Sequence, residues 1–201
     1  MHLLRVIMPR GKGSEFMNIL KEDGAKAISC YYGYGSATSA IKKTLHTDKI
    51  KKEIVMAITD DEMTMKILDD LNEKISHTNT AIAYTSPIDY KGEDELNFEY
   101  VAMYVIVDRQ EGQKAITIAQ ENGAKGATLI HGRGAGKELK SILLNMNIEP
   151  EKDIVIMLVK KELMDPIRDA IYREMNLGEE NKGIIYSLPV MEVRGLVDQN
   201  S

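Results

Sequence analysis

The side chains best suited to chemistry gather in one glycine-rich segment, Gly132-Arg-Gly-Ala-Gly136-Lys137. A turn of this kind that opens a helix presents free backbone N–H groups, which bind anions. The phosphate-binding loop pattern fails, because His131 replaces its first glycine and Glu138 replaces its hydroxyl residue. We therefore expect a small-anion site made by His131, Gly132, Arg133, Gly134, Gly136 and Lys137. The alternative is a plain strand-to-helix turn that needs glycine for a positive φ.

The remaining reactive side chains are scattered. Four histidines lack metal-ligand spacing, and the best local group, His46-Thr-Asp48, is typical of a solvated loop. The single cysteine, Cys30, aligns with Leu129 in the repeat described below, so we expect a small buried hydrophobe and not a nucleophile. No pair of acidic residues recurs, and no nucleophile stands with a base. The sequence predicts no enzymatic activity and no resident cofactor.

Composition narrows the class further. A hydrophobic content of 43% and a charged content of 28% are typical of a soluble globular protein, with no apolar run long enough to span a membrane. A net charge of −5, with both signs interspersed, argues against a nucleic-acid partner. One cysteine and no recognisable export signal predict a cytoplasmic location.

The elements that must position the glycine-rich segment occur twice. Residues 19–35 and 118–134 are identical at seven of seventeen positions, and each copy ends in a Gly-x-Gly turn. Two further echoes follow at offsets of 100 and 102, residues 53–59 with 153–159 and residues 81–87 with 183–189. A period near one hundred residues exceeds that of solenoid repeats, so it predicts two tandem domains, 1–90 and 98–201.

Each copy reads as strand, helix, strand, strand, helix, strand. In the first copy we expect strands at 3–8, 26–32, 53–59 and 81–86. We expect two helices, the first capped by the Ser14 hydroxyl and the second capped by Thr59 or Asp60. The second copy repeats this order, and adds a short helix near 137–144 and a short strand within 191–196. The prediction is an α+β fold of two ferredoxin-like (βαββαβ) domains with antiparallel four-stranded sheets.

Three segments of the second copy resemble the PII nitrogen-regulatory signal-protein family. They are residues 123–134 (Gly-Ala-Lys-Gly-Ala-Thr-Leu-Ile-His-Gly-Arg-Gly), 151–156 (Glu-Lys-Asp-Ile-Val-Ile) and 182–190 (Lys-Gly-Ile-Ile-Tyr-Ser-Leu-Pro-Val). The likeness covers residues 100–196 well and residues 3–87 more weakly. It implies a trimeric, non-enzymatic regulator with the ferredoxin-like fold.

The resemblance also implies a function. Such a protein senses an adenine nucleotide (ATP, ADP or AMP), often with 2-oxoglutarate, and regulates an enzyme or transporter of nitrogen metabolism. The nucleotide is expected in clefts between neighbouring units, walled by the turn after the second strand, the loop before the fourth strand and the tail. This adds Lys182 and Gly183 to the expected site.

The chain also departs from the family pattern. The segments 36–52 and 135–152 are short and contain no tyrosine, and Ile184 and the tail residues Gly195 and Val197 replace expected basic residues. The sequence therefore predicts a divergent PII-like protein. The alternative is a trimeric ferredoxin-like protein that serves in assembly or metal tolerance without nucleotide. In either case six units in three chains predict a homotrimer.

Overall fold

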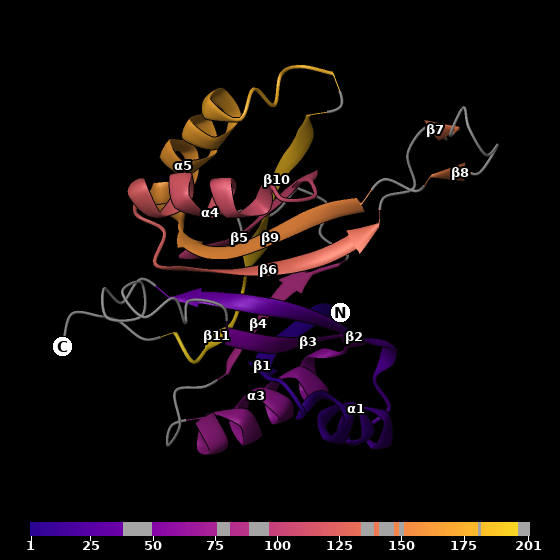
Figure 1. Ribbon diagram of the computed structural model, residues 1–201. Helices are drawn as coiled ribbons and strands as arrows, with labels where there is room; N and C mark the ends of the chain where they lie inside the picture. Colours follow the sequence, from indigo (N-terminus) through magenta and orange to yellow (C-terminus); the bar gives the residue numbers. More distant parts are fainter. Residues whose placement is uncertain are drawn as a thin grey trace. The chain divides into compact units, whose positions relative to one another are not determined.

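The computed structural model describes residues 1–37, 50–75, 81–88, 97–133, 139–140, 147–148, 151–180 and 182–196 (Figure 1). The chain forms two compact units. The first unit consists of Met1–Gly33, Ile50–Val101 and Leu188–Ser201, and the second of Tyr34–Lys49 and Ala102–Ser187.

The first unit is a sheet with two helices. Its strands are ordered β2-β3-β1-β4-β11, and β1 pairs antiparallel with both β3 and β4. The elements are β1 (His2–Pro9), α1 (Gly13–Glu22), β2 (Lys26–Ala37), β3 (Ile50–Thr59), α3 (Asp61–Ile75), β4 (Ile82–Pro87) and β11 (Val193–Arg194).

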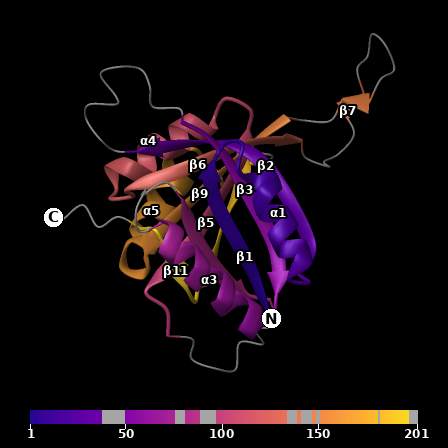
Figure 2. The same cartoon turned by 90° about the horizontal axis from the view of Figure 1, so that it is seen from below.

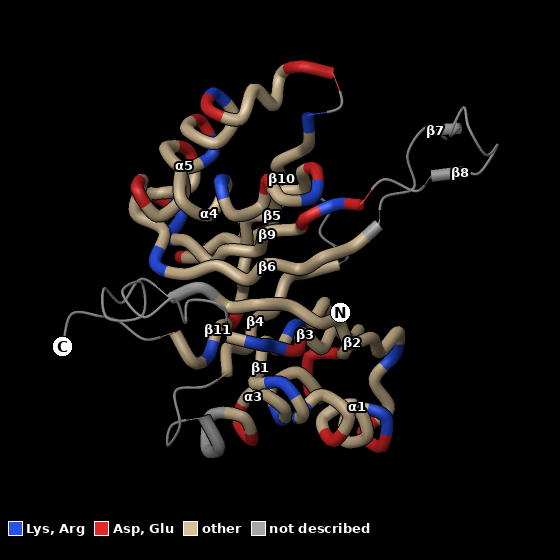
Figure 3. Tube along the Cα trace, in the orientation of Figure 1, with Lys and Arg blue, Asp and Glu red and all other residues tan. Residues whose placement is uncertain are grey.

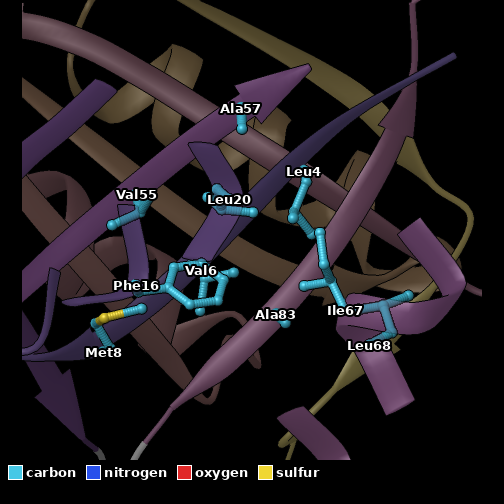
Figure 4. Packing of buried hydrophobic residues seen from close by; sticks show 10 residues of the cluster. All are labelled: Leu4, Val6, Met8, Phe16, Leu20, Val55, Ala57, Ile67, Leu68 and Ala83. Carbon is cyan, nitrogen blue, oxygen red and sulfur yellow. The ribbon is translucent and has the colours of Figure 1, made fainter. Parts of the chain in front are cut away.

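Strand periodicity places the core between this sheet and its helices. Alternate residues of β1 point to one face, as Leu4, Val6 and Met8 do, and Phe16 of α1 packs against them. Figures 1 and 2 show α1 and α3 over the same face of β1 and β3. Figure 4 shows the buried cluster that results: Leu4, Val6, Met8, Phe16, Leu20, Val55, Ala57, Ile67, Leu68 and Ala83.

The second unit repeats this arrangement with the strand order β10-β5-β9-β6. Its elements are β5 (Tyr100–Asp108), α4 (Gly112–Glu121), β6 (Gly126–Arg133), β7 (Leu139–Lys140), β8 (Asn147–Ile148), β9 (Glu151–Lys160), α5 (Lys161–Glu174) and β10 (Gly183–Val190). Strands β6 and β9 are antiparallel. Buried apolar residues on β5, α4 and α5, such as Met103, Ile116 and Ile167, supply the core.

The predicted fold class is confirmed. Each unit has the βαββαβ order with an antiparallel sheet, and none of the helices among the described residues could span a membrane. The boundaries 1–90 and 98–201 stay a prediction about where the two homologous copies begin and end. By contacts, residues 188–201 group with the first unit and residues 34–49 with the second.

The predicted strand in the tail is present as β11, and it adds to the edge of β4. Val193 pairs with Tyr84 and Arg194 with Ala83. Thr85 holds this edge through three bonds: its N–H donates to the Glu192 carbonyl, its carbonyl accepts from the Met191 N–H, and its hydroxyl accepts from the Glu192 N–H. The last residues of the chain that the structure describes therefore complete the sheet of the first unit.

Two local expectations are wrong. Ser14 does not cap α1, because the helix already begins at Gly13 and its free N–H is bound by a carboxylate from β3. Within 137–144, predicted as a helix, Leu139–Lys140 is a strand that pairs with β8; the rest of that segment lies outside the described residues. Asp60, in contrast, caps α3 as expected, since its carboxylate accepts from the Met63 N–H at 2.9 Å.

The turns that follow β1 and β5 require a left-handed residue at the same repeat position. Gly11 has φ +95°, whereas Gln110 in the second copy has φ +80°. A side chain in this region costs about 1–2 kcal/mol, because Cβ crowds the following carbonyl oxygen. The second unit therefore carries a strain that the first avoids.

Replacing Gln110→Gly should raise the free energy of unfolding. The relief of about 1–2 kcal/mol exceeds the about 0.4–1 kcal/mol that a glycine costs through the freer unfolded chain. The matched control is Gly11→Gln, which should lower stability. Urea denaturation measures both, and a loss of stability in Gln110→Gly would contradict the assignment of strain.

Candidate functional site

Four strands of the second unit present the candidate residues at one end of its sheet. The last residues of β6 pair with the first residues of β9, as His131 does with Asp153 and Arg133 with Glu151. The Arg109 N–H, just after β5, donates to the Glu151 carbonyl, and Gly183 at the start of β10 abuts Ile106 of β5. The ends of β5 and β6 and the starts of β9 and β10 therefore meet at this end of the sheet.

Asp153 is the centre of this group. It is 1% exposed, and it directly precedes the apolar stretch Ile154–Val159 of β9. Its Oδ2 accepts from the backbone N–H groups of Gln110 at 3.0 Å and Gly112 at 3.2 Å, at the start of α4. Its Oδ1 lies 2.8 Å from His131 Nδ1 and 3.7 Å from Arg109 Nε. A buried carboxylate needs such partners, and here a helix N-terminus and two side chains supply them.

The contact with Asp153 sets the orientation of His131. Because a carboxylate only accepts hydrogen bonds, Nδ1 of the imidazole carries the proton and donates it to Oδ1. Nε2, on the far side of the ring, is then left for another partner. The side chain is 32% exposed, and the ring of Tyr34 lies 5.6 Å from it, centroid to centroid. His131 therefore offers an oriented polar atom, with an aromatic ring beside it.

Charged residues of both signs surround this centre. Figure 3 shows acidic and basic residues following one another at the start of β9. Lys152 forms an ion pair with Asp108 at 2.5 Å, and its side chain is only 22% exposed. The Arg109 side chain is 40% exposed, so it reaches from Asp153 toward solvent. Asp153 already binds the N-terminus of α4, so an external anion would bind instead to basic side chains that reach solvent, such as Arg109.

The structure places the predicted site residues in two groups. His131, Gly132 and Arg133 end β6. Gly183 begins β10 at the same end of the sheet, and Lys182 directly precedes it. Two strands separate the groups, about 14 Å at the usual spacing between strands. Gly134, Gly136 and Lys137 lie outside the described residues. The structure therefore places the described candidates at one end of the sheet, in two separate groups.

Gly183 is a position that only glycine fits. Its φ is +144°, and a Cβ built there would lie 2.5 Å from the carbonyl oxygen of Ile106 and 2.9 Å from Val107 Cγ1. Gly132 differs, because its Cβ would make only an ordinary contact at 3.7 Å with Ile154. Gly183, the first residue of β10, thus allows close packing against β5, whereas a side chain at Gly132 would meet no clash.

The first unit carries a different version of the same centre. Glu53 takes the place of Asp153, and its Oε2 accepts from the Gly13 N–H at 2.6 Å. Tyr32 takes the place of His131, and the guanidinium of Arg10 lies over its ring at 4.2 Å. The first unit therefore keeps the helix-capping carboxylate and loses the imidazole.

Sequence reasoning missed both carboxylates. The usable signal was a single acidic residue at the same repeat position in two apolar strands, Glu53 and Asp153. A charge in a buried strand needs a partner, and the glycine that begins each helix, Gly13 or Gly112, marks where that partner approaches. A Cβ at Gly112 would lie 2.8 Å from Asp153 Cβ. The described residues hold no group of three or more His, Cys, Asp or Glu that could bind a metal.

Cys30 has the environment expected of a packed thiol. It is half-buried against the core of the first unit and close to Gly13 and Glu53. Burial, and then the negative charge of Glu53, raise the pKa of the Cys30 thiol above its ordinary value of 9.0. A thiol with a raised pKa is a poor nucleophile at neutral pH.

Replacing Asp153→Asn should lower the free energy of unfolding by about 1–3 kcal/mol, because the start of α4 and His131 lose a charged acceptor. The matched change in the first unit, Glu53→Gln, should cost less, since Glu53 accepts from the Gly13 N–H and a tyrosine stands in the place of His131. Urea denaturation of both variants tests this. An Asp153→Asn protein as stable as the wild type would show that the carboxylate does not hold the helix.

The Cys30 thiol should titrate above pH 9 in the folded protein. The Glu53→Gln variant should lower the pKa of Cys30 part of the way, because burial remains the larger cause. Since the folded pKa is raised, this group's contribution to stability is complete below the unfolded pKa and is lost as the pH rises above it. Thiolate absorbance against pH measures the titration, and a midpoint below 9 would refute it.

Comparison with known proteins gives structural likeness only. No family model and no curated protein matches the sequence. The chain is similar to GlnK of B. subtilis in complex with ATP (15% identity, 44% of this chain and 82% of that chain, TM-score 0.34). It is also similar to PII of Arabidopsis thaliana bound to citrate (22% identity, 51% and 83%, TM-score 0.37). A third similar structure is CutA from Synechococcus elongatus PCC7942 (8% identity, 49% and 82%, TM-score 0.36). PII proteins, the family that the sequence resembles, are thus among the solved structures similar to this chain.

Proposed function

We propose that this chain is a PII-like, non-enzymatic regulator whose second unit binds a small anionic metabolite, with an adenine nucleotide as the first candidate. The observation that carries the proposal is the oriented imidazole of His131, held by the buried Asp153 beside Arg109. An anion is recognised by groups that donate hydrogen bonds and carry positive charge. The guanidinium of Arg109 does both, and the imidazole of His131 does both as the imidazolium, in which Nε2 donates as well as Nδ1.

The ring beside His131 supports a ligand with an aromatic part. Tyr34 lies next to the imidazole in the second unit, and Lys182 adds a charge at the same end of the sheet. A nucleotide has both parts, since its base stacks on aromatic rings and its phosphates pair with cations. In the first unit Tyr32 stands at the repeat position of His131, and the guanidinium of Arg10 covers its ring. The first unit is therefore the weaker candidate for ligand binding.

The remaining parts of the proposal come from the family resemblance. We propose that binding alters the interaction with a regulated enzyme or transporter of nitrogen metabolism, and that the chain assembles as a homotrimer. The location of the ligand in clefts between neighbouring units stays a prediction, as does the cytoplasmic location.

Metabolite binding should stabilise the native state. In a thermal-shift screen, at least one of ATP, ADP, AMP and 2-oxoglutarate should raise the midpoint of thermal unfolding. A ligand at a concentration of a hundred times its Kd adds about 2.7 kcal/mol to the free energy of unfolding. Calorimetry on His131→Ala should then show affinity weakened about tenfold or more, because a hydrogen bond to a charged group is worth about 1.5–3 kcal/mol.

The control for that experiment is Arg168→Ala. Arg168 lies on α5, where it pairs with Asp165 and Asp169, so its removal should leave affinity unchanged. Equal binding by wild type and His131→Ala would refute this site. No shift with any metabolite, together with binding of copper or zinc, would favour the alternative of a metal-tolerance assembly protein.

A further inference from the structure

The fourth strands of the two units, β4 and β10, share a sequence pattern. Tyr84-Thr85-Ser86-Pro87 in β4 returns as Tyr186-Ser187-Leu188-Pro189 in β10. Each pattern has a tyrosine, then a hydroxyl residue, and a proline two positions later. In β4 the hydroxyl residue is the one that holds β11.

The two edges differ in what lies beside them. Strand β11 lies along β4, and Tyr84, opposite Val193, is 0% exposed. Among the described residues, β10 has a neighbour on one side only, β5, and its tyrosine, Tyr186, is 42% exposed. Ile184, two residues earlier and so on the same face, is 57% exposed.

The exposed tyrosine of β10 is held in place. Its ring stacks on that of Tyr104 in β5, with centroids 5.0 Å apart and planes 4° from parallel, and Tyr104 is only 6% exposed. An aromatic surface that is ordered before binding loses little conformational entropy when a partner packs on it. Tyr186 and Ile184 therefore form a small, rigid apolar surface along the edge.

This edge also lacks the usual protection. Proteins prevent unwanted pairing at open edges with charged side chains, lysine above all, yet β10 (Gly-Ile-Ile-Tyr-Ser-Leu-Pro-Val) contains no charge. Pro189 would end a ladder there, in the place that Pro87 takes in β4. Between Gly183 and Pro189, the segment Ile184–Ser187 is long enough to pair with a short strand such as β11.

We propose that the edge of β10 between Gly183 and Ser187 binds an extended segment of a partner protein, in the way that β4 binds β11. The segment adds as an antiparallel strand, with an apolar β-branched residue opposite Tyr186, as Val193 is opposite Tyr84. The Ser187 hydroxyl accepts from its backbone, as Thr85 does in the first unit. The inference rests on the proposed function only in taking the chain to regulate a partner.

A partner segment fits this edge better than a second copy of the chain. A stable dimer buries about 1,200 Å² or more, whereas the edge offers two exposed apolar side chains and a few backbone groups. An area of that size suits a short peptide, whose main-chain bonds supply the affinity.

The test uses a labelled peptide of the tail sequence Met-Glu-Val-Arg-Gly-Leu (residues 191–196), which already fits the edge of β4. Fluorescence anisotropy should show saturable binding to the wild-type protein. Tyr186→Asp should abolish it, and Ser187→Ala should weaken it on the order of fivefold through the lost hydroxyl acceptor. The control Tyr172→Ala removes a tyrosine of α5 that is 51% exposed, and it should leave peptide binding unchanged.

Several results would overturn the proposal. They are the absence of saturable binding, equal binding by Tyr186→Asp, or loss of binding in Thr85→Val alone, which would place the peptide on β4. Self-association of the wild type that Tyr186→Asp removes, measured by sedimentation, would make the edge an interface between copies. Metabolite binding measured on the same proteins distinguishes the metabolite site from the peptide-binding edge. Tyr186→Asp should still bind the metabolite, and His131→Ala should still bind the peptide.

Discussion

A buried carboxylate at the start of the third strand holds each unit together at the end where the candidate site lies. Glu53 and Asp153 each leave an apolar strand to bind the free N–H groups that begin the first helix of their unit. The carboxylate gives the helix an acceptor, and the helix N-terminus gives the buried charge its compensation. Glycine begins both helices because the carboxylate approaches so closely that a Cβ would collide with it.

This constraint has a consequence for function. In the second unit the same carboxylate that caps α4 also fixes His131 and attracts Arg109, so a structural interaction orients a potential binding group. A side chain that is held before the ligand arrives loses less entropy on binding. In the first unit, Tyr32 and Arg10 contact each other instead. Two differences at equivalent positions, Glu53 for Asp153 and Tyr32 for His131, thus separate a centre that only caps a helix from one that also orients an imidazole.

The two units also diverge at the opposite edge of their sheets. The tail that follows β10 continues along β4, and its backbone satisfies Thr85. Nothing in the described part of the chain does the same for Ser187, although its surroundings repeat those of Thr85. A tandem chain with one ordered tail strand therefore leaves its two fourth strands unequal. The proposed metabolite site and the proposed docking edge use different residues of the same unit.

The sequence by itself determined the internal repeat and the order of the elements in each copy. These follow from local pattern: the offset near one hundred residues, the apolar strands and the helix spacing repeat along the chain. It did not reveal Asp153 as the centre, nor that Ser14 is no cap. Those depend on residues distant in sequence, since Asp153 lies 22 positions from His131 and Glu53 lies 40 positions from Gly13. Only the tertiary structure decided them, because the order of strands in a sheet determines which strand ends meet.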